Sequence, residues 1–310
     1  MTRRAWFLFA GVSILWGIPF LFIKIAVEEV SPASVAWGRL AIGTAVLLPL
    51  AWRFGALRGL RPRLGKLAIF AALELAIPFS LIAWGERYVS SSIAGILVSA
   101  LPLIVAVLAL RFDRSDRLSG IRVTGLVMGF AGVVLLVGLD VGGEVRELLG
   151  AASILVATVG YAAGALIVKR WLSDLDPLGP IAVALGLSTV MLTPFAVASL
   201  PTATPSTGAI LSIVVLGLAC SAIALLLYFA LIAEVGPGRA AVITYVNPVV
   251  AVALGLAFLG EQVSGVAIAG VVVILTGSWL STRGSVPAAI LAGLTAIRGR
   301  FKRAPNRGRI

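Results

Sequence analysis

The sequence has no histidine and a single cysteine, Cys220. One cysteine excludes an intramolecular disulfide, and the shortage of both residue types excludes a His/Cys zinc site, which needs several such ligands. Cys220 lies inside an apolar run and is expected to behave as a small hydrophobic residue. The Gly65-Lys66 pair lacks the earlier glycine and the following serine or threonine of a phosphate-binding loop. The sequence therefore predicts no metal and no other cofactor, and ATP-driven pumping would need a separate partner.

Charged residues are also scarce, at 12% of 310 residues, whereas 60% are hydrophobic. A soluble domain carries roughly 25% charged residues, so this chain has too little charge to cover a water-facing surface. A bilayer core needs roughly 20 apolar residues per helix. Runs of that kind cover residues 5–24, 33–52, 67–84, 92–110, 123–139, 148–168, 178–200, 210–233, 240–259 and 263–280. Because the runs are continuous, we predict an all-α integral membrane protein with ten transmembrane helices.

The net charge of +12 is distributed unevenly between the predicted connections. Of 25 Lys and Arg residues, 21 fall on one side of the predicted membrane plan, and only Arg87 and Arg146 fall on the other. Because basic connections stay in the cytoplasm, the pattern predicts a cell (inner) membrane protein with cytoplasmic N- and C-termini. The basic clusters are short and separated by apolar runs, so lipid rather than nucleic acid is the expected partner, above all for the basic tail 283–310.

The two halves of the chain echo each other. The pairs Lys24/Lys169, Pro32/Pro177, Pro49/Pro194, Gly125/Gly270 and Gly132/Gly277 match at a spacing of 145, and Pro102/Pro248 match at 146. Each half holds five spans, an odd number, so the second half enters the membrane from the opposite side. We predict two inverted five-helix repeats, residues 1–140 and 141–282. Such proteins bind solute between the halves and alternate access, although a duplication can also persist for packing alone.

The order and spacing of several short segments are similar to those of a known family. The segments are Leu15-Trp16-Gly17 followed by Lys24, Ser92–Leu110 with Pro102, Ala241–Glu261, and the glycine-rich Gly125–Leu136 and Gly265–Gly277. Together they resemble the EamA family of drug/metabolite transporters over residues 5–282. The resemblance implies a ten-helix fold with a substrate cavity and transport of small metabolites such as amino acids, often with proton exchange. The sequence departs from the family pattern at Arg111-Phe112-Asp113, where an acidic residue is expected directly after the fourth helix.

Two ionisable residues lie deep within predicted spans. A carboxylate at mid-helix, as at Glu74, costs roughly 2.5–3.5 kcal/mol on insertion scales and usually faces a cavity or a partner. We predict that Glu74 lines the pathway and is a candidate proton carrier; the competing interpretation is a neutral glutamate that ties helices together. Arg39 is a candidate for binding a solute carboxylate or for a salt bridge, with Glu74 as one available partner. Lys24, near the end of its span, is expected to snorkel to the interface.

Pro102 and Pro248, related by the repeat, are predicted to be hinges or site-forming kinks, because proline frees a helical carbonyl. Their polar neighbours Ser99, Tyr245 and Asn247 are candidate solute contacts, with Asn247 expected to make a polar contact and Tyr245 to form a wall. Interhelical hydrogen bonds worth about 0.6–2 kcal/mol are the competing role.

Trp16 and Tyr161 match at the same spacing and are candidates to face and gate a central cavity; lipid-facing or packed positions are the alternative. Two glycine pairs, Gly125-xxx-Gly129 and Gly160-xxx-Gly164, fit the rule for close helix contact. We expect that contact within the chain, with a homodimer as the less favoured option.

Taken together, the sequence predicts a secondary carrier, with export slightly favoured. It is expected to move small organic metabolites such as amino acids by alternating access, with protons as an optional coupling partner. A passive channel or a structural membrane component is the main alternative. An intramembrane enzyme is less favoured, because the chain lacks histidine and a Gly-x-Ser-x-Gly elbow. No catalytic residue is predicted.

Overall fold

The computed structural model describes residues 2–112, 120–139, 141, 144–236 and 240–282. Every regular element among these residues is helical, as the continuous apolar runs predict. The predictions for the basic tail 283–310 and for Asp113 fall outside the described residues.

The helices of the first half are α1 (Arg3–Gly17), α2 (Pro19–Val27), α3 (Pro32–Arg53), α4 (Leu64–Ala71), α5 (Ile77–Gly85), α6 (Ser91–Val98), α7 (Leu101–Phe112) and α8 (Gly120–Leu139). Those of the second half are α9 (Val145–Ile167), α10 (Leu178–Ala198), α11 (Thr207–Gly217), α12 (Ala224–Val235), α14 (Ile243–Phe258) and α15 (Gly265–Thr282). A short 3₁₀ turn, η1 (Arg61–Arg63), precedes α4, and three π-helices interrupt longer spans: η2 (Ala72–Ala76), η3 (Val168–Leu172) and η4 (Leu218–Ile223).

Eight helical segments of the described chain are long and apolar enough to cross a membrane. They are Arg3–Val27, Pro32–Arg53, Arg61–Gly85, Ser91–Leu108, Gly120–Leu139, Val145–Leu172, Leu178–Ala198 and Thr207–Val235, and the apolar helices Ile243–Phe258 and Gly265–Ser281 are shorter. Large apolar side chains point outward from these segments, among them Phe7 and Trp52, which are 80% and 76% exposed. Such a surface is stable in lipid rather than in water, which confirms the prediction of an all-helical membrane protein.

Prolines begin helices where a span is built from two pieces. Proline suits the first turn of a helix, because the N–H that it lacks has no partner there. Pro19 is the first residue of α2, directly after the break that ends α1 at Gly17. Pro78 is the second residue of α5, after η2, and Pro102 is the second residue of α7.

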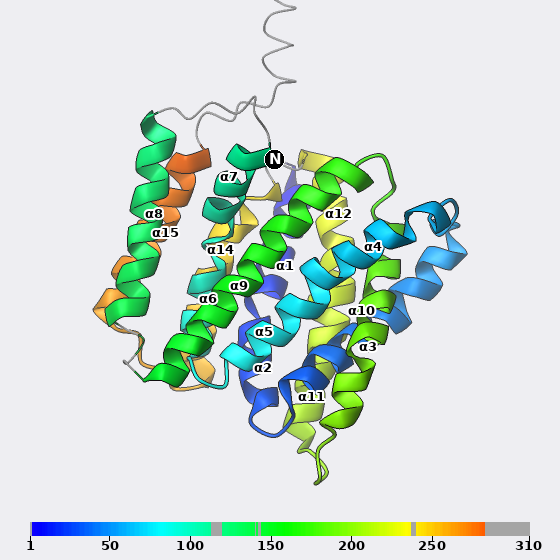
Figure 1. Ribbon diagram of the computed structural model, residues 1–310, viewed down its shortest axis with the longest axis horizontal. Helices are drawn as coiled ribbons and strands as arrows, with labels where there is room; N and C mark the ends of the chain where they lie inside the picture. The colour runs from blue at the N-terminus through cyan, green and yellow to red at the C-terminus, as the bar shows by residue number, and fades with distance from the viewer. Residues whose placement is uncertain (1, 113–119, 140, 142–143, 237–239, 283–310) are drawn as a thin grey trace, which may run out of the picture.

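Helices from the two halves of the chain pack against each other (Figure 1). The main pairs are α8 with α15, α3 with α10, α5 with α9, α6 with α14, α2 with α11, and α1 with α12. A Cβ atom at Gly125 would lie 2.7 Å from the carbonyl oxygen of Gly277, and one at Gly160 would lie 2.6 Å from that of Leu73. Real Cβ contacts are longer, so these glycines let helix backbones touch. The predicted close contact within the chain is confirmed for both glycine pairs.

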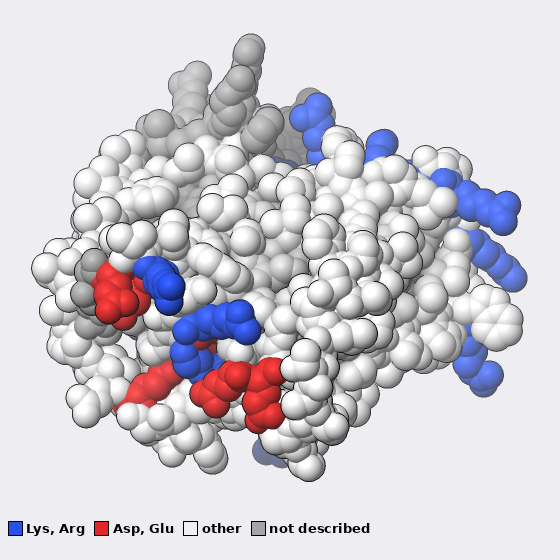
Figure 2. Space-filling view, turned by 60° about the horizontal axis from the view of Figure 1, so that its bottom comes forward, with Lys and Arg blue, Asp and Glu red and all other residues white. Residues whose placement is uncertain are grey.

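The ends of the described helices place the connections on two sides of the molecule. The start of α1 and the end of α15 both lie at the top in Figure 1, whereas α8 ends and α9 begins at the bottom. Acidic side chains gather on the lower face together with some basic ones, and basic side chains alone project at the right-hand end, near α3 and α4 (Figure 2).

Candidate functional site

Arg39 of α3 lies where helices of both halves meet. Its side chain is only 8% exposed. The Nε–H donates a hydrogen bond to Oγ of Ser221 at 2.9 Å, and Cζ lies 3.9 Å from the centroid of the Phe79 ring. None of the described carboxylates forms an ion pair with Arg39, so its predicted pairing with Glu74 is not formed. The cation is incompletely compensated, because burying a charge costs more than one hydroxyl and one aromatic face offset.

Two π-helices occupy equivalent places in the two halves, and the one in the second half, η4, packs on α3 and reaches Arg39. Glu74 lies in η2, and Cys220 and Ser221 lie in η4; a step of 145 residues from Glu74 reaches Ala219, also in η4. The Ser221 hydroxyl donates to the carbonyl oxygen of Leu216 at 3.0 Å and so presents its lone pairs to Arg39. Single π-turns within α-helices occur frequently at functional sites.

Glu74 is the second ionisable side chain of the site. Its Oε2 is buried and has no hydrogen-bond partner among the described residues. The side chain packs against Gly164 of α9, where a Cβ atom would lie 3.0 Å from Cβ of Glu74, so the glycine makes room for the acid. An unpaired buried carboxylate carries its full desolvation penalty. The group is therefore stable here as a carboxylic acid or beside a donor that is not part of the described chain.

Aromatic side chains surround the two ionisable groups. Tyr161 of α9 is partly buried, packs against both of the larger hydrophobic clusters, and lies within electrostatic range of Arg39 and Glu74. Trp16 of α1 packs on Tyr228 of α12 with ring centroids 4.7 Å apart, and Tyr228 lies within range of Glu74. The structure thus brings four of the predicted site residues into one region.

Ser99 and Asn247 have local partners instead. Ser99 is buried at the end of α6 and donates to the carbonyl oxygen of Ile96 at 2.5 Å. In the amide orientation that satisfies its hydrogen bonds, the Asn247 nitrogen donates to Ser13 of α1 at 3.3 Å and to Ile243 at 2.9 Å, in both cases at the carbonyl oxygen. The bond from Asn247 to Ser13 fits the competing interpretation, an interhelical hydrogen bond, whereas the bond of Ser99 stays within the end of α6.

Tyr245 lies in a different place. Together with Leu275, Thr276 and Trp279 it lines an open, mostly apolar surface pocket of about 350 Å³. The residues around Arg39 take no part in this pocket, so the structure separates Tyr245 from the other predicted contacts.

Pro102 and Pro248 differ in position although the repeat relates them. Pro102 is the second residue of α7, after the break at Ser99 and Ala100, so it removes no hydrogen bond from a continuous helix. Pro248 lies inside α14 and leaves the carbonyl of Thr244 without its helical donor. Their role as hinges stays a prediction.

The sequence predicted neither the burial of Glu86 nor the hydrogen-bond partners of Lys24. Glu86, which follows α5, is fully buried, and neither carboxylate oxygen has a hydrogen-bond partner among the described residues. Lys24, predicted to snorkel to the interface, reaches the connection between α5 and α6 with its ammonium group. Its Nζ donates to the carbonyl oxygens of Glu86 at 2.6 Å and Val89 at 3.0 Å, because the unpaired carbonyls that follow a helix attract a cation.

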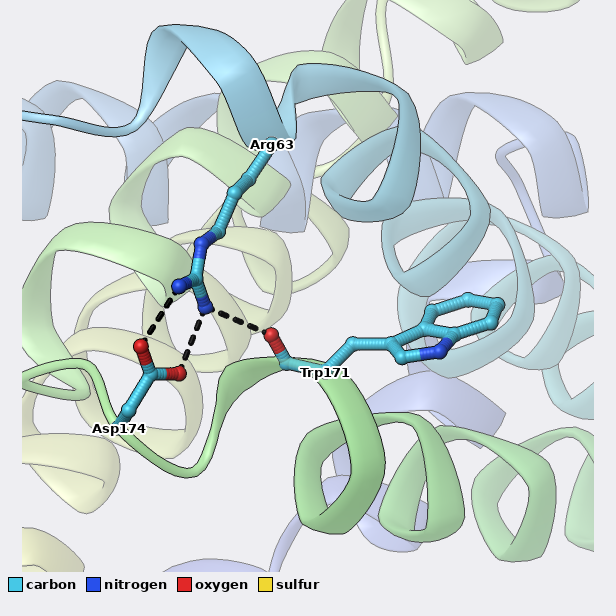
Figure 3. A network of polar contacts seen from close by, with 3 residues as sticks. All are labelled: Arg63, Trp171 and Asp174. Carbon is cyan, nitrogen blue, oxygen red and sulfur yellow. Dashed lines mark hydrogen bonds and ion pairs between the residues drawn. The ribbon is translucent and has the colours of Figure 1, made fainter.

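Acidic residues at equivalent positions link the two halves at the ends of helices. Asp174 accepts two hydrogen bonds of 2.6 Å from Arg63, which also donates to the Trp171 carbonyl oxygen at 2.8 Å (Figure 3). Glu29, 145 residues before Asp174, accepts two hydrogen bonds of 2.6 Å from the backbone N–H and hydroxyl of Ser206. The hydrogen bonds from Arg63 and Ser206 hold the pKa values of Asp174 and Glu29 below their usual range.

The fold and the site together indicate the class of protein to which this chain belongs. A multi-pass helical membrane protein with an incompletely compensated polar centre between its two halves has the architecture of a solute transporter. The model of the EamA-like transporter family matches residues 3–138 and again residues 148–283. The chain therefore belongs to the EamA-like transporter family.

Several relatives span nearly the whole chain. The uncharacterized inner membrane transporter YedA of Escherichia coli K12 is 32% identical, over 86% of this chain and 89% of its own length. An uncharacterized transporter of Archaeoglobus fulgidus is 28% identical, over 90% and 99%. A probable terminal-alkyne amino-acid exporter of Streptantibioticus cattleyicolor is 25% identical, over 91% and 94%. These names point away from an enzyme.

One solved crystal structure has a similar fold. It superimposes with a TM-score of 0.64 at 20% identity and covers 91% of this chain and 97% of its own. The likeness extends over both halves of the chain.

Proposed function

We propose that this protein is a secondary carrier that moves small organic solutes such as amino acids across the cell membrane by alternating access, with export favoured. The spans form ten transmembrane helices in two inverted five-helix repeats, residues 1–140 and 141–282, with both termini in the cytoplasm. The solute binds between the repeats, beside Arg39, Glu74, Trp16 and Tyr161.

Contacts that recur when the two halves are exchanged support the repeats. α5 packs on α9, and the segments 145 residues away from these, α12 and α1, also pack together. A Cβ at Gly125 would contact the carbonyl oxygen of Gly277. The repeat relates these two residues to Gly270 and Gly132, and a Cβ at Gly270 would contact the carbonyl oxygen of Gly132. Thr44 and Thr189, exactly one repeat apart, share a hydrogen bond of 3.1 Å between their hydroxyls. A residue that touches its own counterpart lies beside a pseudo-two-fold axis.

The observation that carries the solute assignment is the incomplete compensation of Arg39. Its Nε–H is bonded to Ser221, and no described residue accepts a hydrogen bond from either Nη group. A guanidinium presents a planar fork that matches a carboxylate. A solute carboxylate would supply the missing counter-charge, and the Tyr161 and Phe79 rings would provide apolar walls.

A panel of solutes tests this assignment by thermal shift of the purified carrier. Amino acids and other small carboxylates should raise the Tm of the wild type, and their methyl esters should not. Arg39→Ala should abolish the response, and Arg39→Lys, which keeps the charge but loses the fork, should retain only part of it. A carboxylate that stabilises Arg39→Ala as strongly as the wild type would rule out the role of Arg39.

Glu74 is the proposed carrier of a coupling proton within this site. Its π-helix, η2, packs on α4, α5, α9 and α10. Its carboxyl group has one oxygen buried without a partner among the described residues and lies within electrostatic range of Tyr161 and Tyr228. Such a group is neutral while enclosed and ionises when water reaches it.

A further inference from the structure

Glu86 is not one of the residues assigned above to the solute site, although it lies within electrostatic range of Arg39. It follows the last residue of α5, Gly85, and is 0% exposed. Both carboxylate oxygens are buried, and no described residue donates a hydrogen bond to either of them. An enclosed carboxylate without donors is strongly disfavoured relative to the neutral acid.

Three charged groups from three other segments act on this carboxyl group. Lys24 of α2 donates from Nζ to the backbone carbonyl oxygen of Glu86 itself, at 2.6 Å. Arg39 of α3 and Glu261, on the connection after α14, also act on it. From α9, which packs against α5, the uncharged Gly150 and Ser153 reach the neighbouring Gly85.

Glu261, the acidic residue that acts on Glu86, is held by hydrogen bonds at the start of α6. Its Oε1 accepts from the backbone N–H of Ser91 at 2.6 Å, and its Oε2 accepts from the N–H and hydroxyl of Ser92 at 3.0 and 2.5 Å. The carboxylate therefore caps the N-terminus of α6, where the helix dipole favours negative charge. Glu86 and Glu261 thus lie within electrostatic range of each other, and of the two only Glu261 has hydrogen-bond donors among the described residues.

We propose that Glu86 is a second proton-binding site of this carrier, which holds a proton in the enclosed conformation described here and releases it when its surroundings open to water. The O–H bond of the carboxylic acid breaks, the proton passes to water, and the carboxylate left behind is balanced by the ammonium of Lys24. The use of this proton in transport rests on the proposed carrier function, whereas the proton site itself does not.

The electrostatic balance around Glu86 agrees with the geometry. Burial raises the pKa of Glu86 well above its usual range, Lys24 lowers it, Glu261 raises it and Arg39 lowers it. Removing Lys24 should therefore keep Glu86 protonated to higher pH, and neutralising Glu261 should let it ionise at lower pH.

Infrared difference spectroscopy of the full-length carrier in lipid tests the proton site without any solute. Because Glu74 is also proposed to hold a proton, the test is made in the Glu74→Gln background, which removes the carbonyl band of that acid. At neutral pH this variant should still show the carbonyl band of a carboxylic acid, which disappears at alkaline pH, and adding Glu86→Gln should remove it. In the same background, Lys24→Met should move the midpoint of its loss to higher pH, and Glu261→Gln to lower pH. A band that stays unchanged when Glu86→Gln is added would overturn the proposal.

A transport measurement tests the coupling role. Proteoliposomes are supplied from outside with a labelled solute identified by the panel. An imposed pH gradient should accelerate its uptake by the wild type, and in Glu86→Gln uptake should fall to its level without a gradient. A full response to the gradient in Glu86→Gln would overturn the coupling role. Absence of any wild-type transport would instead refute the carrier function and leave the infrared assignment of the proton site standing.

Discussion

At the scale of single residues, Arg39 and Glu74 differ from the other ionisable groups in what surrounds them. Most Lys and Arg residues lie on connections, where water or lipid headgroups solvate their charge. Arg39 is buried with one hydroxyl and one aromatic ring as partners, and Glu74 has an unsatisfied oxygen. Burying a charge without full compensation lowers the stability of a membrane protein, so a buried charge of this kind indicates a functional site.

The proton role of Glu74 is tested by Glu74→Gln, which keeps the size and polarity of the side chain but cannot ionise. Transport by the wild type should depend on pH, because the acid must gain and lose a proton in each cycle. In Glu74→Gln that dependence should flatten, and the rate should fall. Initial rates measured across a pH series give the answer, and a wild-type profile in the variant would remove Glu74 from the proton pathway.

Several members of the site could be predicted from the sequence, because a charge within an apolar run is conspicuous. This holds for Arg39 and Glu74. Ser221 and Phe79 could not be predicted as partners of Arg39, since serines and aromatic residues are common in apolar spans and nothing local marks the one that faces a cation. Glu86 was missed because it lies just beyond a span, where acids are usually solvated.

At the scale of elements, the sequence predicted the approximate positions of the apolar helices but neither their exact ends nor how they are interrupted. The predicted run 67–84 is a helix, a π-helix and a second helix, and the run 210–233 has the same construction. Side-chain hydrophobicity sets the length of a span, whereas a π-turn is one extra residue accommodated within it. No pattern of apolar residues distinguishes that turn from regular helix.

The close approach of α8 and α15 is tested by adding one methyl group at Gly277. A Cβ there would lie 2.6 Å from the Gly125 carbonyl oxygen, so the helices must separate. Gly277→Ala should lower the free energy of unfolding by about 1–3 kcal/mol, the usual cost of overpacking. Gly265→Ala in the same helix is the matched control, since nothing lies within 4 Å of its Cβ position. Thermal unfolding in detergent compares the two; equal Tm values would show that the contact is dispensable.

At the scale of the whole molecule, the two halves supply matching parts of the proposed site. Each contributes one π-helix, and the acids Glu29 and Asp174 link each half to the other at equivalent positions. The sequence predicted this relation from a few matching prolines and glycines. It could not predict which helices of opposite halves touch, because that depends on three-dimensional packing rather than on the order of residues.

The inverted arrangement is tested with reporter tags placed at Gly143 and at the C-terminus. An odd number of spans between the two tags puts them in opposite compartments, with the C-terminus in the cytoplasm on the basic side. Compartment-specific alkaline phosphatase and fluorescent fusions read the outcome. Both tags in one compartment would refute the five-and-five plan.

Counterflow in proteoliposomes tests the central claim, alternating access by a carrier, most directly. Vesicles containing the purified protein are loaded with an unlabelled solute that stabilises it in the thermal-shift panel, and entry of the labelled solute is followed from outside. A carrier should accumulate label transiently above its external concentration, because each outward passage of unlabelled solute returns the site to the outside. Entry of label that only approaches the external concentration, and is not stimulated by internal solute, would contradict the account.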